Sequence, residues 1–130
     1  MDSTSSHNQS VASHTLHKLI EACKMLLLWN EQISSMNDYL ASTYGMEKMA
    51  ASCMMIESIG EGCKKIDKLM PMFLETQCPE IPWREVKGMR DHIAHGYFDI
   101  DAEVVYLVVK EEIPVLLQAF LQLRDLIIKN

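Results

Sequence analysis

Five side chains able to do chemistry lie within eight consecutive residues, Arg90 to Tyr97: a guanidinium, a carboxylate, two imidazoles and a phenol. Histidine titrates near neutral pH, so it can move protons during a reaction. Arginine binds phosphate oxygens in a bidentate manner and stabilises the negative charge that develops on them. RNA supplies its own nucleophile, the 2′-hydroxyl group. Arg90 and His95 are therefore a sufficient minimal set for cleaving RNA without a metal ion.

The same residues also have a purely structural interpretation. Arg90 and Asp91 would then form a solvated helix surface, and a cationic His95 would be stabilised at a helix C-terminus by the helix dipole. His92 falls on the other side of the turn, where a structural or surface role is expected. Residue types and spacing alone leave both interpretations open.

The spacing of Arg90 and His95 also bears on assembly. On one ideal helix the two residues lie about 140° apart, at about 100° per residue, so they cannot both point straight at one small ligand. Asp91 and His95, which are four residues apart, share a helix face. If the helix lies along a groove, Arg90 can line one wall while Asp91 and His95 line the floor. A second copy of the same helix can then supply the other wall. This geometry predicts a two-fold dimer.

Other candidate sites have weaker support from the spacing. His14 and His17 have the spacing of metal ligands on a helix, but no third ligand is evident, so we expect no metal and no cofactor. Glu57 and Glu61 are interpreted as a solvated helix face, where Glu61 can pair with Lys65. The four cysteines lack Cys-x-x-Cys spacing and are expected to be reduced thiols.

Periodicity predicts that helices position these residues. Apolar side chains recur at three- and four-residue steps over residues 14–36 and 46–73, which indicates two long helices. Between them, a short helix capped near residue 37 is expected to run through Tyr44 and to end at Gly45.

Prolines divide the second half of the chain. Pro71 is expected to kink or end the second long helix, and a breaker segment covers residues 76–82. Pro82 suits the first turn of a helix that ends near His95, with Gly96 as the left-handed residue beyond it.

The remaining elements are also expected to be helical. Residues 104–109 have strand propensity, but a lone strand would have no partner, so we predict a helix there, capped by Asp99 or Asp101. Pro114 starts the last helix. The predicted fold is all-α, an antiparallel bundle of four or five helices.

Length and composition favour a single domain. Residues 1–13 are polar and are expected to form a disordered tail, followed by one helical domain over 14–130. We expect a cytoplasmic protein, because no apolar run reaches the roughly 18 residues of a membrane span and the N-terminus lacks a secretory pattern. The net charge of −6 opposes RNA binding, so either a local basic cleft exists, or the affinity for RNA is low, or RNA is not the substrate.

Three stretches resemble HepT-like proteins of the HEPN superfamily. The central stretch is specific: Pro-Glu-Ile-Pro-Trp-Arg-Glu-Val at 79–86, Gly-Met-Arg-Asp at 88–91, and His-Gly-Tyr-Phe-Asp-Ile-Asp at 95–101. Upstream, Ile-Gly-Glu-Gly-Cys-Lys-Lys at 59–65 is similar to the family's Ile-Gly-Glu-Ala-x-Lys segment. Residues 112–117 resemble the start of its C-terminal helix. The resemblance covers about residues 14–128.

This resemblance implies a HEPN-like helical bundle that forms a two-fold homodimer, with an Arg-x4-His-x-Tyr motif in a cleft at the interface. It implies the toxin of a toxin–antitoxin pair, a metal-independent endoribonuclease acting on RNA. The antitoxin is an MNT-type minimal nucleotidyltransferase that transfers AMP to the motif tyrosine. Carried onto this sequence, Arg90 and His95 become the catalytic pair, Asp91 helps to orient the site, and Tyr97 is the AMP acceptor.

Two departures from the family pattern concern activity more than fold. Asp91 replaces the asparagine that often follows the motif arginine, which adds negative charge beside the phosphate site. Met54 and Met55 stand where members commonly carry a polar pair. The alternative function is a non-catalytic dimeric binding module for a nucleotide or a nucleotidyltransferase partner.

Overall fold

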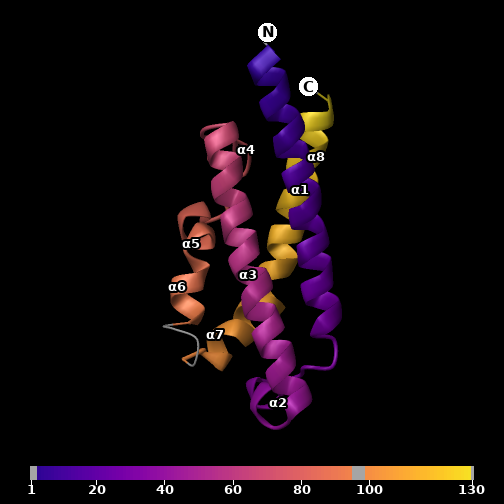
Figure 1. The fold of residues 1–130 in the computed structure, drawn as a ribbon, viewed down its shortest axis with the longest axis vertical. Helices are drawn as coiled ribbons and strands as arrows, with labels where there is room; N and C mark the ends of the chain where they lie inside the picture. The colour runs from indigo at the N-terminus through magenta and orange to yellow at the C-terminus, as the bar shows by residue number, and fades with distance from the viewer. Residues whose placement is uncertain (1–2, 95–98, 130) are drawn as a thin grey trace.

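Three long helices form the body of the molecule: α1 (Ser3–Trp29), α3 (Thr43–Leu69) and α8 (Ile113–Lys129). The computed structural model describes residues 3–94 and 99–129. Helix α1 packs against both α3 and α8, which run antiparallel to it (Figure 1). Within those ranges there is no β-strand beyond one isolated bridge, and no helix is both long and apolar enough to cross a membrane. The predicted all-α helical bundle is confirmed.

Shorter helical segments connect the long helices. They are α2 (Met36–Leu40), α4 (Phe73–Gln77), α5 (Trp83–Lys87), α6 (Met89–Ile93), α7 (Ala102–Leu107) and the π-helix η1 (Val108–Glu112). Segments α5 and α6 lie beside α3, whereas α7, η1 and α8 follow one another without a break (Figure 1). The helix predicted over residues 104–109 is therefore confirmed.

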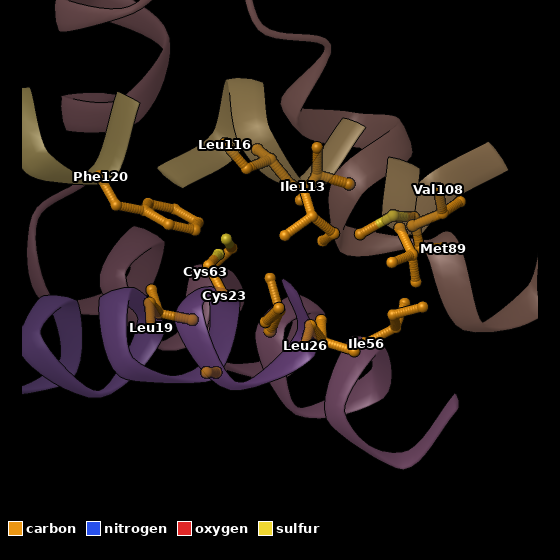
Figure 2. Close-up of a cluster of buried hydrophobic side chains, with 14 of the residues drawn as sticks. Leu19, Cys23, Leu26, Ile56, Cys63, Met89, Val108, Ile113, Leu116 and Phe120 are labelled. Carbon is orange, nitrogen blue, oxygen red and sulfur yellow. The ribbon is translucent and has the colours of Figure 1, made fainter. Parts of the chain in front are cut away.

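The hydrophobic core lies where the three long helices meet (Figure 2). Its buried residues recur every three or four positions along each helix, as the periodicity predicts. They include Leu16, Ile20, Cys23 and Leu26 of α1, Ile56, Ile59, Cys63 and Ile66 of α3, and Ile113, Leu116, Phe120 and Leu123 of α8. Burying one large apolar side chain contributes about 1.5–3 kcal/mol. This core holds α3 in place, and α3 supports the short helices beside it.

The start of α1 differs from the prediction. The helix begins at Ser3, whereas the sequence pattern suggested a disordered tail over residues 1–13. Ala12 is buried, and the Nδ2 atom of Asn8 donates a hydrogen bond to the carbonyl oxygen of Leu69 at 3.2 Å. These contacts hold the polar N-terminal segment against the bundle. Its amino-acid composition alone does not reveal them.

Gly45 does not end a helix, as the sequence suggested. Helix α2 ends at Leu40, and Gly45 lies in the first turn of α3, whose N-cap Ser42 accepts a hydrogen bond from the Gly45 N–H at 3.0 Å. A Cβ atom at position 45 would lie 1.8 Å from the carbonyl oxygen of Asp38. Glycine is required there because the backbones of α2 and α3 nearly touch.

The break predicted at Pro71 is confirmed. Helix α3 ends at Leu69, and Met72 adopts a left-handed conformation with φ of 67°. The chain thus reverses just after α3, and α4 packs back on it.

Candidate functional site

The segment that carries Arg90 is anchored by one buried face. Trp83 and Val86 of α5 and Met89 and Ile93 of α6 are buried, whereas Arg90 is exposed. The sequence predicted one continuous helix here, but α5 and α6 are separated at Gly88, with φ of −102° and ψ of 12°. The buried face fixes the segment and leaves the opposite face open to a ligand.

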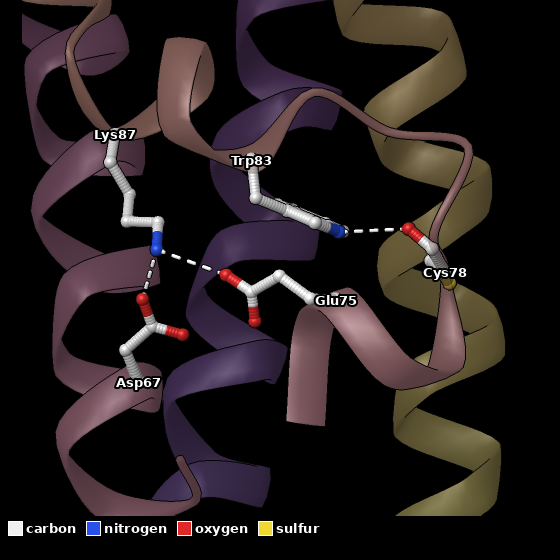
Figure 3. A network of polar contacts seen from close by, with 5 residues as sticks. All are labelled: Asp67, Glu75, Cys78, Trp83 and Lys87. Carbon is white, nitrogen blue, oxygen red and sulfur yellow. Dashed lines mark hydrogen bonds and ion pairs between the residues drawn. The ribbon is translucent and has the colours of Figure 1, made fainter. Parts of the chain in front are cut away.

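Trp83 is the main anchor of α5. Its ring packs against Phe120 of α8, with the ring centroids 6.0 Å apart, and its Nε1–H donates to the Cys78 carbonyl oxygen at 2.9 Å. Figure 3 shows this bond reaching from the indole to the loop before α5. The bond satisfies a donor that would otherwise be buried and unpaired. Both ends of the indole thus contribute to fixing α5.

Gly60 lets α5 approach α3 closely. A Cβ atom at position 60 would lie 3.2 Å from the carbonyl oxygens of both Val86 and Lys87. The last turn of α5 therefore lies directly against the α3 backbone. Gly60 belongs to the Ile-Gly-Glu segment that resembles HepT-like proteins. The close contact with α5 gives a physical reason for a glycine at this position.

Lys87 joins three helices through its side chain. Its ammonium contacts one carboxylate oxygen of Asp67 on α3 and, at 3.1 Å, one of Glu75 on α4 (Figure 3). Burial lowers the pKa of Lys87, but the hydrogen bonds and charges of the two carboxylates outweigh burial and raise the pKa above its ordinary value. The second oxygens, Asp67 Oδ1 and Glu75 Oε2, are buried and have no hydrogen-bond partner within residues 3–94 and 99–129. One ammonium therefore serves two carboxylates.

Glu57 of α3 forms an ion pair with Arg90. Its Oε1 atom lies 3.3 Å from Nη1 of Arg90, and the two side chains are 42% and 63% exposed. The sequence suggested only a solvated carboxylate pair of Glu57 and Glu61. Glu57 lies one helical turn before Gly60, on the side of α3 that faces α5 and α6, but no sequence pattern pairs it with Arg90.

The other predicted site residues are placed less completely. Asp91 is exposed on α6, whereas His95 and Tyr97 lie outside the described residues, as does Gly96, the predicted C-terminal glycine. The residues that flank them are paired: Ala94 forms an antiparallel bridge with Ile100.

The predicted angle between Arg90 and His95 rested on one straight helix, and that premise is wrong. Helix α6 ends at Ile93, and Ala94 is extended, with φ of −150° and ψ of 133°. Neither the separation of about 140° nor the shared helix face of Asp91 and His95 therefore applies. The helix predicted to end near His95 ends two residues earlier, because Ala94 pairs with Ile100 instead of continuing α6.

The predicted cap at Asp101 is confirmed, since its carboxylate accepts the Val104 N–H at 3.2 Å.

The cysteines are free thiols, as predicted. Cys23 and Cys63 face one another in the core (Figure 2), and burial raises the pKa of each to about 12. Burial also raises the pKa of Cys53 to about 11. These thiols are protonated at neutral pH and are not nucleophiles.

Comparison with known proteins places this chain in a family. A family model described as ribonuclease HepT-like matches residues 29–123, a range that includes Glu57, Lys87 and Arg90. The chain belongs to the HepT-like family. The resemblance seen in the motif is thus confirmed over most of the chain.

Individual relatives of the HepT-like family share a shorter stretch. The chain is 45% identical over 69 residues to "Probable ribonuclease HepT" of Thermococcus cleftensis, which is 53% of this chain and 59% of that protein. It is 40% identical over 65 residues to a Methanocaldococcus jannaschii protein named "Putative RNase", or 50% of this chain and 53% of that protein. The chain thus spans somewhat more than half the length of these curated relatives. No solved structure matched the chain.

Proposed function

We propose that this chain is a ribonuclease whose working residues are Arg90 and His95. The observation that carries the proposal is the exposed guanidinium of Arg90 on a helix anchored through its buried face, in a chain of the HepT-like family. The Glu57 carboxylate lies at one terminal nitrogen of Arg90. The guanidinium has five N–H donors, so others remain available for a phosphate.

The proposed reaction is internal transesterification of RNA and uses no metal ion. The 2′-oxygen attacks the adjacent phosphorus while its proton passes to a base, and the bond to the 5′-oxygen breaks. The leaving 5′-oxygen takes up a proton, so the products are a 2′,3′-cyclic phosphate and a 5′-hydroxyl end. His95 moves the protons, Arg90 stabilises the charge on the phosphate oxygens, and Asp91 helps to orient the site.

The proposal includes a two-fold homodimer in which two copies of the motif face one cleft. The family resemblance supports this assembly. Static light scattering should give twice the 14.9 kDa chain mass.

The biological role proposed is that of a cytoplasmic toxin paired with an MNT-type nucleotidyltransferase antitoxin. Transfer of AMP to Tyr97 would place a charged phosphodiester beside the phosphate site. Repulsion between like charges and the bulk of the adenosine would then block RNA. The test is intact-mass analysis after incubation with the nucleotidyltransferase and ATP. A gain of one AMP in the wild type, absent in Tyr97→Phe, is expected, and persistence of the gain in Tyr97→Phe contradicts the role.

The decisive test of the ribonuclease proposal is cleavage of RNA in EDTA. The wild-type protein should produce 2′,3′-cyclic phosphate ends, and Arg90→Ala and His95→Ala should each abolish them. Arg84→Ala is the matched control, because Arg84 is also an exposed arginine, on the neighbouring α5. Activity that disappears in EDTA and returns with magnesium contradicts the proposed chemistry.

A second candidate function is a non-catalytic dimeric module that binds a nucleotide or a nucleotidyltransferase. The net charge of −6 and the carboxylate beside Arg90 favour it, because both weaken the attraction of a long RNA. Binding of a nucleotide in an equilibrium titration, together with no RNA cleavage in the assay above, would decide for this alternative.

A further inference from the structure

A hollow of about 370 Å³ lies between α1 and α3, on the other side of α3 from the Arg90 segment. Lys18, Lys65 and His14 are polar members of its lining, whereas Leu19, Met55 and Gly62 supply apolar surface. The hollow therefore offers cationic groups and an apolar surface to the same ligand.

The hollow depends on small residues at the helix contact. A Cβ atom at Gly62 would lie 2.7 Å from Cδ2 of Leu19 on α1, so glycine permits the close approach of the two helices. Ala22, which also lines the hollow, leaves space beside it where a longer side chain would project. The recess is thus a consequence of the residues at the packing interface of α1 and α3.

The charges at the hollow contrast with the rest of the molecule. The chain carries 12 lysines and arginines against 18 acidic residues, yet two exposed lysines line this hollow. Neither Lys18 nor Lys65 has an ion-pair partner among the described residues. The acidic residue in the lining, Glu61, is paired with Lys64 at 3.1 Å. The hollow therefore presents a local surplus of positive charge.

The hollow and the candidate site share one helix. Glu57, which contacts Arg90, and Ser58, which lines the hollow, are consecutive residues of α3. The two sites thus lie on different sides of one helix, whose diameter with its side chains is about 10–12 Å. A single ligand strand that crosses the exposed side of α3 can reach both.

We propose that this hollow binds a nucleotide unit of the RNA strand whose scissile phosphate lies at Arg90. Lys18 and Lys65 hold a phosphate, and the apolar surface of Leu19 and Met55 takes the base or ribose. The proposal rests on the ribonuclease function proposed above. It resolves the objection raised by the acidic composition, because RNA needs only a local track of cations and not a basic protein.

The test compares two double variants that remove the same number of positive charges. Lys18→Gln/Lys65→Gln removes the lysines of the hollow. Lys24→Gln/Lys48→Gln is the control, because Lys24 pairs with Glu21 and Lys48 lies over the Tyr44 ring, both outside the hollow lining. The probes are a short single-stranded RNA for cleavage and its fluorescein-labelled 2′-O-methyl form, which cannot be cleaved, for binding by anisotropy.

The hollow variant should raise the KM for RNA about tenfold and leave kcat unchanged, whereas the control should change neither. Between about 50 and 200 mM salt, the slope of log K against log salt should fall by about 0.7, because the two lysines hold one phosphate and each single-strand phosphate contact contributes about 0.7. Ser58→Trp, which fills the hollow without removing a charge, should also raise KM.

Three outcomes overturn the proposal or separate it from the proposed function. Equal behaviour of the two double variants overturns the RNA subsite, and cleavage by the wild type would still support the ribonuclease. A changed molecular mass of the hollow variant in light scattering also overturns the subsite, because the hollow then belongs to a contact between copies. Lysine-dependent binding of the 2′-O-methyl strand without any cleavage of RNA supports the subsite and contradicts the ribonuclease.

Discussion

The Glu57 carboxylate of α3 lies 3.3 Å from the Arg90 guanidinium of α6, and this ion pair links the long core helix to the short helix beside it. The contact is exposed to solvent on both sides, so its contribution to stability is small, about 0.5 kcal/mol. The ion pair matters more for the orientation of Arg90, because it limits the rotamers that this long side chain can adopt.

The first prediction concerns Glu57 as a positioning residue. Glu57→Ala should lower kcat for RNA about tenfold, which corresponds to about 1.4 kcal/mol of transition-state stabilisation. The free energy of unfolding should change by less than about 1 kcal/mol. Glu57→Gln should recover part of kcat, because its amide oxygen can still accept from the guanidinium. A kcat unchanged in Glu57→Ala contradicts the positioning role.

A second prediction concerns the charge balance around Lys87. Lys87→Met leaves the carboxylates of Asp67 and Glu75 close together without a cation, so the free energy of unfolding should fall by about 2 kcal/mol. This is less than for a fully buried pair, because the Lys87 side chain is 21% exposed. Urea denaturation of the purified protein measures the change.

The control for Lys87 is a second substitution that restores the balance. Asp67→Asn/Lys87→Met removes one carboxylate with the ammonium and should regain about half of the lost stability. If the double variant is less stable than Lys87→Met, Lys87 acts through its packing and not through its charge.

Much of the fold follows from the sequence because burial imposes a local period. The steps from Leu16 to Leu26 and from Ile56 to Ile66 reveal two core helices directly. The role of Gly45 does not follow from the sequence, because a glycine that ends a helix and a glycine that permits a close helix contact look alike in one sequence. Only the packing of Asp38 against α3 distinguishes them.

The candidate site could be predicted only in part. Arg90 was found from its chemical type and its motif, but its partner Glu57 comes from another helix, and no local pattern pairs the two. The extended backbone at Ala94 was missed for a similar reason: it depends on pairing with Ile100, and alanine itself favours a helix.

A third prediction is loss of stability in alkali. The pKa of Cys23 and of Cys63 rises from an ordinary value of 9.0 to about 12 because both thiols are buried. In the unfolded chain these thiols lose their protons above about pH 9, and in the folded protein they retain them, so the unfolded state gains stability as pH rises. The denaturation midpoint should be unchanged from pH 7 to 8.5 and fall steadily toward pH 11. A midpoint that stays constant to pH 11 contradicts the burial of both thiols.

The last prediction uses two glycines of one contact region. Gly60→Ala introduces a Cβ atom 3.2 Å from two backbone oxygens of α5, so α5 and the Arg90 helix behind it must shift by a few tenths of an ångström. Gly88→Ala introduces the same atom between α5 and α6, but its nearest neighbours are 3.6 and 3.9 Å away, and the φ of −102° suits alanine. Gly88→Ala should therefore keep kcat and gain up to about 1 kcal/mol of stability, because alanine restricts the unfolded chain.

Gly60→Ala should lower the free energy of unfolding by about 1–3 kcal/mol, as overpacked sites do. It should also lower kcat for RNA at temperatures well below its Tm, since small displacements of a positioned group are costly to catalysis. Thermal unfolding and initial cleavage rates of the two variants, measured side by side, give both quantities. If Gly60→Ala loses stability but retains full kcat, the contact of α3 with α5 supports the fold without setting the position of Arg90.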